Sequence, residues 1–157
     1  MKVELWMVGK TNFGYLKEGI ELYEKRLKHY LSLELKVIPD LKNSKNLKAD
    51  QFRRKEGDIL LQKLQKDDFL ILLDEKGKEF SSISFSKYME DHFLSSKKRI
   101  VFLIGGAFGF SKEIYERSNS KITLSKMTFS HQMVRLFIIE QLYRSFTILK
   151  NEPYHHR

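Results

Sequence analysis

Short apolar runs alternate along the chain with longer segments in which apolar residues recur every three or four positions. The runs are brief and rich in β-forming residues, which is typical of strands buried in a sheet. They predict strands over residues 2–8, 33–38, 69–73, 100–104 and 121–124. The third run reads FLILL and the fourth reads IVFLI, so we expect both strands to be covered on both faces.

The intervening segments have the spacing of amphipathic helices. Helices are expected over residues 16–30, 49–64, 83–93 and 130–149, with a short one after Ser111. Strands that alternate with helices are typical of an α/β fold with a mostly parallel sheet and helices on both faces. Since no repeat or linker interrupts the pattern, residues 1–157 are predicted to form a single domain.

Two polar segments are predicted to be loops. Residues 41–46 are rich in Lys, Asn and Ser, and we expect them to be mobile. Residues 74–80 are highly charged around Gly77 and directly follow an apolar run. They are predicted to form a charged turn.

The chain carries 29 Lys and Arg against 20 Asp and Glu, which gives a formal charge of +9. Both halves of the chain share this excess, so a folded surface carries it rather than a basic tail. Such a surface favours a polyanionic partner, because phosphate binding releases counterions. A basic surface can also serve solubility alone, so charge leaves both interpretations open.

The absence of cysteine excludes disulfide scaffolds, Cys-ligated zinc, iron–sulfur clusters and thiol nucleophiles. Metal-ligand spacing is missing apart from the tail histidines, so we expect no metal. The longest apolar stretch is too short to span a bilayer, which takes about 20 residues. The N-terminal run contains Glu4, unlike a signal peptide. We therefore expect a soluble, cytoplasmic protein without membrane association.

A glycine-rich segment, GGAFG, follows the apolar run that ends at Ile104 and leads to Ser111, which can cap the next helix. Ligands in open α/β sheets bind at the carboxyl ends of strands, where glycines allow close approach to the backbone. The spacing matches neither a dinucleotide fingerprint nor a P-loop. Glycines of a tight turn would look the same, so this segment alone is ambiguous.

A second candidate segment, LSKMTFSH, leads from the last strand into the last helix. That helix is apolar on nearly every face, which is typical of a buried helix or an interface. Its polar exceptions pair four residues apart, His131 with Arg135 and Glu140 with Arg144. The Glu140 pair is most simply a structural ion pair. Arg135 favours a functional role, because an unpaired buried cation is costly and an anionic substrate would compensate it.

Four segments in this order resemble the SPOUT superfamily of methyltransferases: FLIGGAFGFS, LSKMTFSHQMVR, EQLYRS and the terminal PYHHR. They are most similar to the small bacterial methyltransferases of large-subunit ribosomal RNA, which methylate N3 of a pseudouridine. The resemblance covers the whole chain. It implies S-adenosylmethionine as methyl donor, a trefoil knot in the C-terminal part of the chain, and a homodimer whose site is completed across the interface.

The resemblance also implies roles for individual residues. Donor binding is expected at Leu73, Gly105, Leu124, Ser125, Lys126, Met127, Thr128 and Phe129. RNA contact is expected at His131, Tyr154, His155 and Arg157, and catalysis at Arg135, Tyr154 and His155. An apolar loop such as residues 124–129 suits adenine. The N3 proton must leave, so Arg135 is expected to stabilise the developing anion and a tail histidine to take the proton.

Two alternatives stay open at this point. A noncatalytic RNA-binding or ribosome-assembly protein with the same fold would keep the basic surface, although the intact loops argue against it. Methyl transfer to another RNA, such as transfer RNA, has the same physical requirements. The partner is expected to be ribosomal RNA or the assembled ribosome, and a chain without a separate RNA-binding module favours a large substrate.

Overall fold

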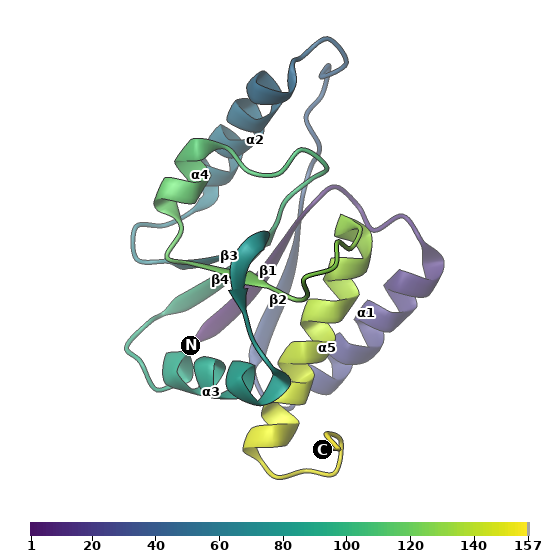
Figure 1. Cartoon of the computed structure of the whole chain (residues 1–157), viewed down its shortest axis with the longest axis vertical. Coiled ribbons are helices and arrows are strands. Elements are labelled where there is room, and N and C mark those ends of the chain that lie inside the picture. The colour runs from purple at the N-terminus through teal and green to yellow at the C-terminus, as the bar shows by residue number, and fades with distance from the viewer. Residues whose placement is uncertain (157) are drawn as a thin grey trace.

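The computed structural model describes residues 1–156, in which helices and strands alternate along the chain (Figure 1). The elements are β1 Lys2–Val8, α1 Gly14–Leu27, β2 Ser32–Ile38, α2 Ala49–Lys63, β3 Phe69–Glu79, α3 Ser82–Phe93, β4 Arg99–Ile104, α4 Lys112–Arg117, β5 Ser120–Thr123 and α5 His131–Leu149. The predicted α/β fold is confirmed.

Within these residues the strands form one five-stranded sheet in the order β2-β1-β4-β3-β5. Every pairing is parallel. The three most apolar runs form the centre of the sheet, while β2 is half-buried at one edge. Because all strands run the same way, their carboxyl ends meet at one edge of the sheet, where the loops that follow them gather.

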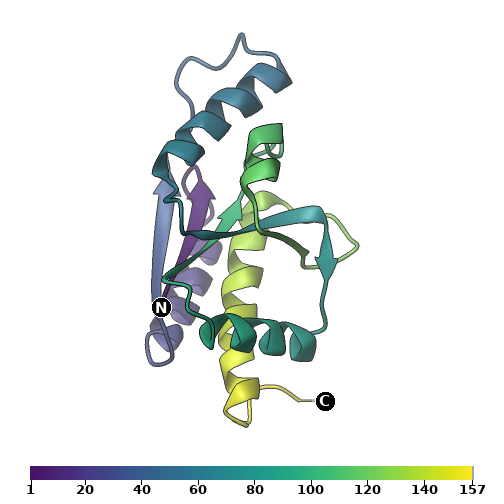
Figure 2. The same cartoon turned by 90° about the vertical axis from the view of Figure 1, so that its left-hand side faces the viewer.

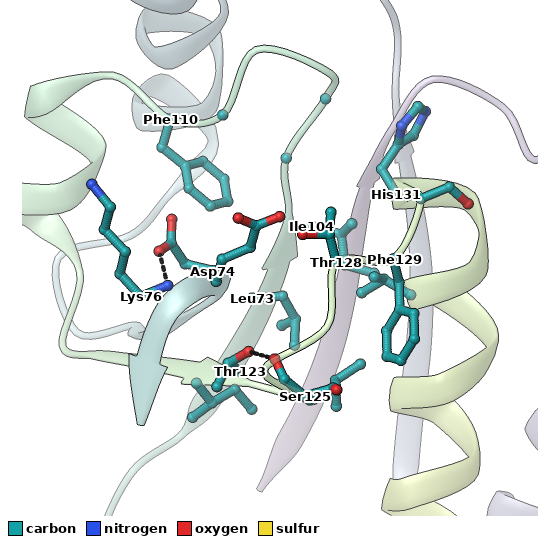
Figure 3. Close-up of a pocket in the computed structure, with 18 of the residues that line it drawn as sticks. Leu73, Asp74, Lys76, Ile104, Phe110, Thr123, Ser125, Thr128, Phe129 and His131 are labelled. Atoms are coloured by element: carbon teal, nitrogen blue, oxygen red, sulfur yellow. Dashed lines mark hydrogen bonds between the residues drawn. The ribbon is translucent and has the colours of Figure 1, made fainter. Parts of the chain in front are cut away.

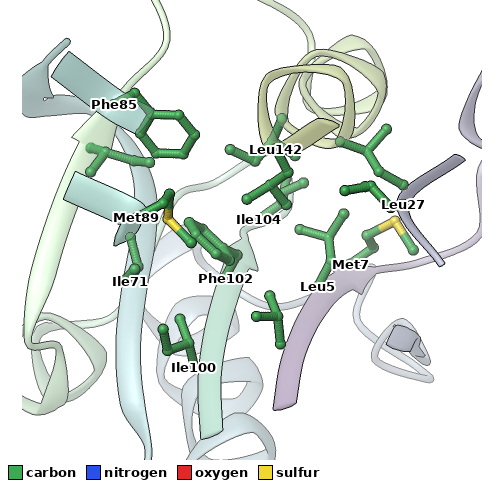
Figure 4. Packing of buried hydrophobic residues seen from close by; sticks show 14 of the residues in the cluster. Leu5, Met7, Leu27, Ile71, Phe85, Met89, Ile100, Phe102, Ile104 and Leu142 are labelled. Atoms are coloured by element: carbon green, nitrogen blue, oxygen red, sulfur yellow. The ribbon is translucent and has the colours of Figure 1, made fainter. Parts of the chain in front are cut away.

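Helices cover both faces of the sheet (Figures 1 and 2). α1, α3 and α5 pack on the face that carries Leu5 and Phe102, and Figure 4 shows this layer. α2 and α4 pack on the opposite face, against Trp6 and Leu103. Successive strand residues point to opposite faces, so a strand covered on both sides must be apolar throughout. This explains why the central strands have continuous apolar runs.

The predicted turn over residues 74–80 is wrong, because β3 continues to Glu79. β3 pairs with β5 both before and after an irregularity, with Leu73 and Lys78 each opposite Ile122. Gly77 lies so close to β5 that a Cβ there would be 2.4 Å from the carbonyl carbon of Ile122. The glycine therefore marks a close approach of two strands rather than a turn.

As predicted, serine residues cap the N-termini of α4, which follows the glycine-rich loop, and of α5, which follows the last loop. The Ser111 hydroxyl accepts from the Ile114 amide at 3.3 Å, and Ser130 accepts from the Met133 amide at 3.2 Å. In α5, Arg144 Nε donates to Glu140 Oε1 at 3.0 Å, which confirms the predicted ion pair. Among residues 1–156, no helix has both the length and the apolar character needed to cross a membrane.

A buried charged cluster closes the opposite edge of the sheet, where the strands begin. The fully buried Glu4 accepts from Trp6 Nε1 at 2.7 Å and forms ion pairs with Lys36 and Arg99. Burial alone would raise the pKa of Glu4, but the hydrogen bonds from Trp6 and Lys36 outweigh it, and the pKa is about 2. Since its partners keep this carboxylate charged, the cluster is structural.

Candidate functional site

A cavity of about 560 Å³ opens at the carboxyl ends of β4 and β5 and beside residues 73–76 of β3, where that strand is irregular (Figure 3). Its volume lies in the range of small-molecule sites, about 300–1,000 Å³. It is lined by Leu73, Asp74, Glu75, Lys76, Ile104, Gly105, Gly106, Ala107, Gly109, Phe110, Tyr115, Ile122, Thr123, Leu124, Ser125, Met127, Thr128, Phe129, Ser130, His131 and Val134. The structure therefore brings together the expected donor-binding residues with one exception, since Lys126 is not part of this lining.

The glycine-rich loop forms one wall of the cavity. A Cβ on Gly105 would lie 2.9 Å from the ring of Phe110, which itself lines the cavity. The turn is closed by a hydrogen bond from the Gly109 amide to the Gly106 carbonyl at 3.3 Å, and Gly109 has a φ of 75°. Both positions require glycine, the first for space and the second for its left-handed backbone. At its glycines the wall thus presents backbone to a ligand, beside the ring of Phe110.

The segment between β5 and α5 forms the facing wall. The Thr123 hydroxyl donates to the Ser125 carbonyl at 2.7 Å, and the Met127 amide donates to Ser125 Oγ at 2.9 Å, so local bonds fix its path (Figure 3). The ring of Phe129 packs on Phe137 of α5 at 4.9 Å. Met127 is 75% exposed, which leaves an apolar side chain at the cavity mouth. An apolar wall of this kind suits a flat aromatic ligand group.

Sequence reasoning missed an acidic part of the wall, at Asp74 and Glu75. Asp74 accepts from the Lys76 amide at 2.8 Å and from the Tyr115 hydroxyl. Burial and this bond to Asp74 raise the pKa of Tyr115 to about 12. Glu75 is exposed and makes no hydrogen bond or ion pair with the described residues. Their position directly after the apolar run FLILL was the available signal, but the predicted turn obscured it.

Arg135 is completely buried and lies outside the cavity lining. Its guanidinium donates to the carbonyl oxygens of Val8 at 2.7 Å and Gly9 at 3.0 Å, and to the hydroxyl of Thr11 at 3.1 Å. Only its Nε lacks a partner, and burial lowers the pKa of the group. These partners are neutral, so the structure contradicts only the expectation that Arg135 lacks partners, and its catalytic role stays a prediction. Arg135 ties α5 to the end of β1.

One known protein family has a model that matches nearly the whole chain. The family model described as "Predicted SPOUT methyltransferase" matches residues 1–155. The chain belongs to the SPOUT methyltransferases. The predicted family and the predicted enzyme class, a methyltransferase, are thereby confirmed.

Relatives of this SPOUT chain carry the name "Ribosomal RNA large subunit methyltransferase H". The protein of Christiangramia forsetii is 56% identical over 157 residues, 100% of both chains. That of Parabacteroides distasonis is 55% identical over 156 residues, 99% of both chains. That of Flavobacterium johnsoniae is 54% identical over 157 residues, again 100% of both. The similarity thus covers the cavity, α5 and the tail alike.

The C-terminal tail of the SPOUT chain folds back on the far end of α5, away from the cavity (Figure 1). The Tyr154 hydroxyl donates to Glu140 Oε1 at 2.9 Å, and its ring lies 4.6 Å from the Arg144 guanidinium. His155 Nδ1 is 3.3 Å from the same guanidinium. Glu140 and Arg144 lie 9 and 13 residues after His131, about 14 and 20 Å along α5, so the tail side chains contact this helix beyond the turns that line the cavity.

The structure thus places the expected RNA-contacting and catalytic residues at different positions along α5. His131 lies in the cavity lining at its first turn, whereas the side chains of Tyr154 and His155 lie against Glu140 and Arg144, farther along the helix. Arg157 lies outside the described residues. The predicted homodimer and the trefoil knot stay predictions.

Proposed function

We propose that this chain transfers a methyl group from S-adenosylmethionine to N3 of a pseudouridine in large-subunit ribosomal RNA. The observation that carries the proposal is the cavity at the strand ends, with a wall of bare backbone at Gly105. The names of the full-length relatives support ribosomal RNA as substrate. The net charge of +9 supports a phosphate-rich partner. Such a substrate would place the enzyme in the cytoplasm.

The cavity suits the chemistry of this donor, which supplies an electrophilic methyl group on a sulfonium when bound. Leu73 and residues 124–129 offer apolar surface for adenine. The backbone at Gly105 permits close approach of the donor because no side chain intervenes. Asp74 and Glu75 place carboxylates where the donor's positive charges need compensation. Since methyl transfer is an in-line displacement, these residues would act mainly by positioning.

Removal of the N3 proton calls for a base near the cavity. An imidazole titrates near neutral pH and suits this task. His131 lies in the lining and is proposed to contact the RNA. His155 is proposed to accept the proton, and Tyr154 is proposed to stack on the target nucleobase. Both residues would be supplied by a second copy of the chain. The contacts of the tail support a second copy, because Tyr154 and His155 are held against Glu140 and Arg144 of their own α5, outside the cavity lining.

The surface of α5 supports a homodimer. Met133 and Phe137 are only partly buried, and the ring of Phe137 packs on that of the exposed Phe129, which lines the cavity. Exposed apolar surface of this kind marks interaction sites. A two-fold dimer through α5 would bury it and bring each tail toward the other cavity.

Donor binding is tested with Gly105→Val, which places a side chain against Phe110 in the cavity wall. Calorimetry with S-adenosylmethionine should show binding to the wild type and none to this variant. Gly14→Val is the matched control, because a Cβ at Gly14 meets nothing within 4 Å. Unchanged affinity in a folded Gly105→Val protein would place the donor elsewhere. A wild type that binds no donor would favour the noncatalytic alternative.

The RNA target is tested by mass spectrometry of RNA from a strain that lacks this protein. One methyl group should disappear from a pseudouridine of large-subunit ribosomal RNA and return with the wild-type gene. Transfer RNA from the same strain serves as the second arm, and a loss confined to it would overturn the ribosomal assignment. Purified enzyme with free ribosomal RNA or intact ribosomes then separates these two substrates.

Assembly of the site across a dimer is tested by mixing two inactive variants. One carries Gly105→Val and an intact tail, and the other lacks residues 154–157 but keeps its cavity. If the tail acts on the partner's cavity, the mixed dimer contains one complete site and regains activity that neither variant has alone. Failure of a verified mixed dimer to regain activity would show that the tail serves its own chain or no site at all.

A further inference from the structure

Helix α2 contacts the glycine-rich loop, residues 105–111, at three points on the side away from the cavity. Arg53 Nη1 donates to the Phe108 carbonyl at 3.2 Å. Gly57 lies so close to Ser111 that a Cβ would be 2.4 Å from its hydroxyl oxygen. Between them, the Glu56 carboxyl faces Gly106, with Oε2 3.4 Å from the place a Cβ would take. The loop is therefore held between α2 on one side and the cavity on the other.

Glu56 is the unusual member of this contact. Its side chain is 5% exposed, and Oε2 has no hydrogen-bond partner among the described residues. No ion pair compensates its charge within residues 1–156, in contrast to the buried Glu4. A buried carboxylate without a cation is destabilising, so packing does not explain it. An uncompensated buried charge beside a cavity is typical of a functional residue.

The charged groups around Glu56 are few. Asp40, in the segment before α2, acts on Glu56 electrostatically and has the same sign. Arg135 of α5 is engaged with carbonyl oxygens of the β1 end, and the loop segment Gly106–Phe110 has no charged side chain. Burial and Asp40 raise the pKa of Glu56 to about 7, while the Gly106 backbone amide favours the charged form. The loop backbone thus offsets only part of the cost of burying the ionised carboxylate.

We propose that Glu56 is a positioning residue for methyl transfer, whose carboxylate holds the Gly106 amide and so keeps the glycine-rich loop in the shape that binds the donor. This inference rests on the proposed function, since it assumes that the cavity takes S-adenosylmethionine. Glu56 acts through the loop backbone and lies outside the cavity lining. The ionised form grips the loop, and protonation releases it, so donor affinity falls as the pH drops through neutrality.

The test is calorimetry with S-adenosylhomocysteine, the demethylated product, between pH 5.5 and 8.5. Wild-type affinity should be about tenfold higher at the alkaline end, the scale of one hydrogen bond to a charged group. Glu56→Gln should show the weaker affinity at both ends. Comparison of the two proteins removes the titration of the ligand's own amine. Asp58→Asn, an exposed carboxylate on the same helix, should keep the wild-type profile.

Two further measurements separate positioning from folding. Asp40→Asn removes the like charge and should move the wild-type pH step to lower pH. In methylation assays, Glu56→Gln should raise KM for the donor with little change in kcat, and its thermal unfolding should show a folded protein.

The outcomes distinguish this inference from the proposed function. A wild type that binds no donor at any pH overturns both. A wild type that binds the donor, with a Glu56→Gln variant of equal affinity and the same pH profile, overturns only the role of Glu56. Hydrogen exchange of the ligand-free protein adds a readout independent of the donor. The amides of residues 106–110 should exchange faster in Glu56→Gln, and unchanged exchange rates would contradict the proposed grip on the loop.

Discussion

Substitution of Arg135 distinguishes two roles for this residue. A structural link between α5 and the end of β1 and a catalytic cation predict different effects on stability and turnover. Arg135→Ala removes a fully buried side chain and leaves the carbonyl groups of Val8 and Gly9 without their donor. Loss of hydrogen bonds from a charged donor costs about 1.5–3 kcal/mol, and truncation of a large buried side chain costs about 2–5 kcal/mol. These effects overlap, so we expect a loss of at least about 3 kcal/mol.

That loss is a large share of the stability of an ordinary domain, about 5–15 kcal/mol. Urea unfolding followed by far-ultraviolet circular dichroism measures it directly. Donor binding and methyl transfer should decline together with the folded fraction. Lys112→Ala is the control, because its ion pair with Glu116 is exposed and its loss should cost about 1 kcal/mol or less. An Arg135→Ala protein with wild-type stability but turnover lowered a hundredfold would refute the structural link and support a catalytic role.

Two further predictions follow from the packing around the site. Gly77→Ala drives a Cβ into the Ile122 backbone, so it should lower stability by about 1–3 kcal/mol in urea unfolding and weaken donor binding through β5, whereas Gly14→Ala changes neither. Burial and Asp40 raise the pKa of Glu56 from 4.5 to about 7, so the protein loses stability as the pH rises through this window. Glu56→Gln should therefore have a free energy of unfolding up to about 3 kcal/mol higher than the wild type at pH 8, with a higher unfolding temperature, and about the same stability near pH 4.5. A wild type that is the more stable protein at pH 8 would contradict the raised pKa.

The sequence predicts those helices, strands and loops whose structure depends mainly on residues close to them in the chain. The run IVFLI predicts a strand covered on both faces, and β4 is that strand. Ser111 and Ser130 predict the starts of two helices, because an N-cap serine bonds to a backbone amide only three residues later in the chain. The glycine-rich loop and residues 124–129 are likewise predicted to share a site, since parallel strands end at one edge of the sheet.

The sequence does not predict features that depend on distant partners. β3 continues through charged residues because β5 and the close approach at Gly77 accommodate them, which no local pattern reveals. Arg135 donates hydrogen bonds to the carbonyl groups of Val8 and Gly9, which are 127 and 126 residues away in the chain. Glu56 is inconspicuous in the sequence of a polar helix, and only its burial against Gly106 distinguishes it.

The two buried glutamates differ in whether a cation compensates their charge. Glu4 lies at the edge of the sheet farthest from the cavity, and Trp6 and Lys36 keep its pKa at about 2. Glu56 lies behind the cavity wall, and its pKa rises to about 7 although basic residues outnumber acidic ones in the chain. A cation beside Glu56 would stabilise the fold, yet it would also draw the carboxylate away from the Gly106 amide. The unpaired charge is therefore best understood as serving the loop, in the way that strained or unstable residues gather at functional sites.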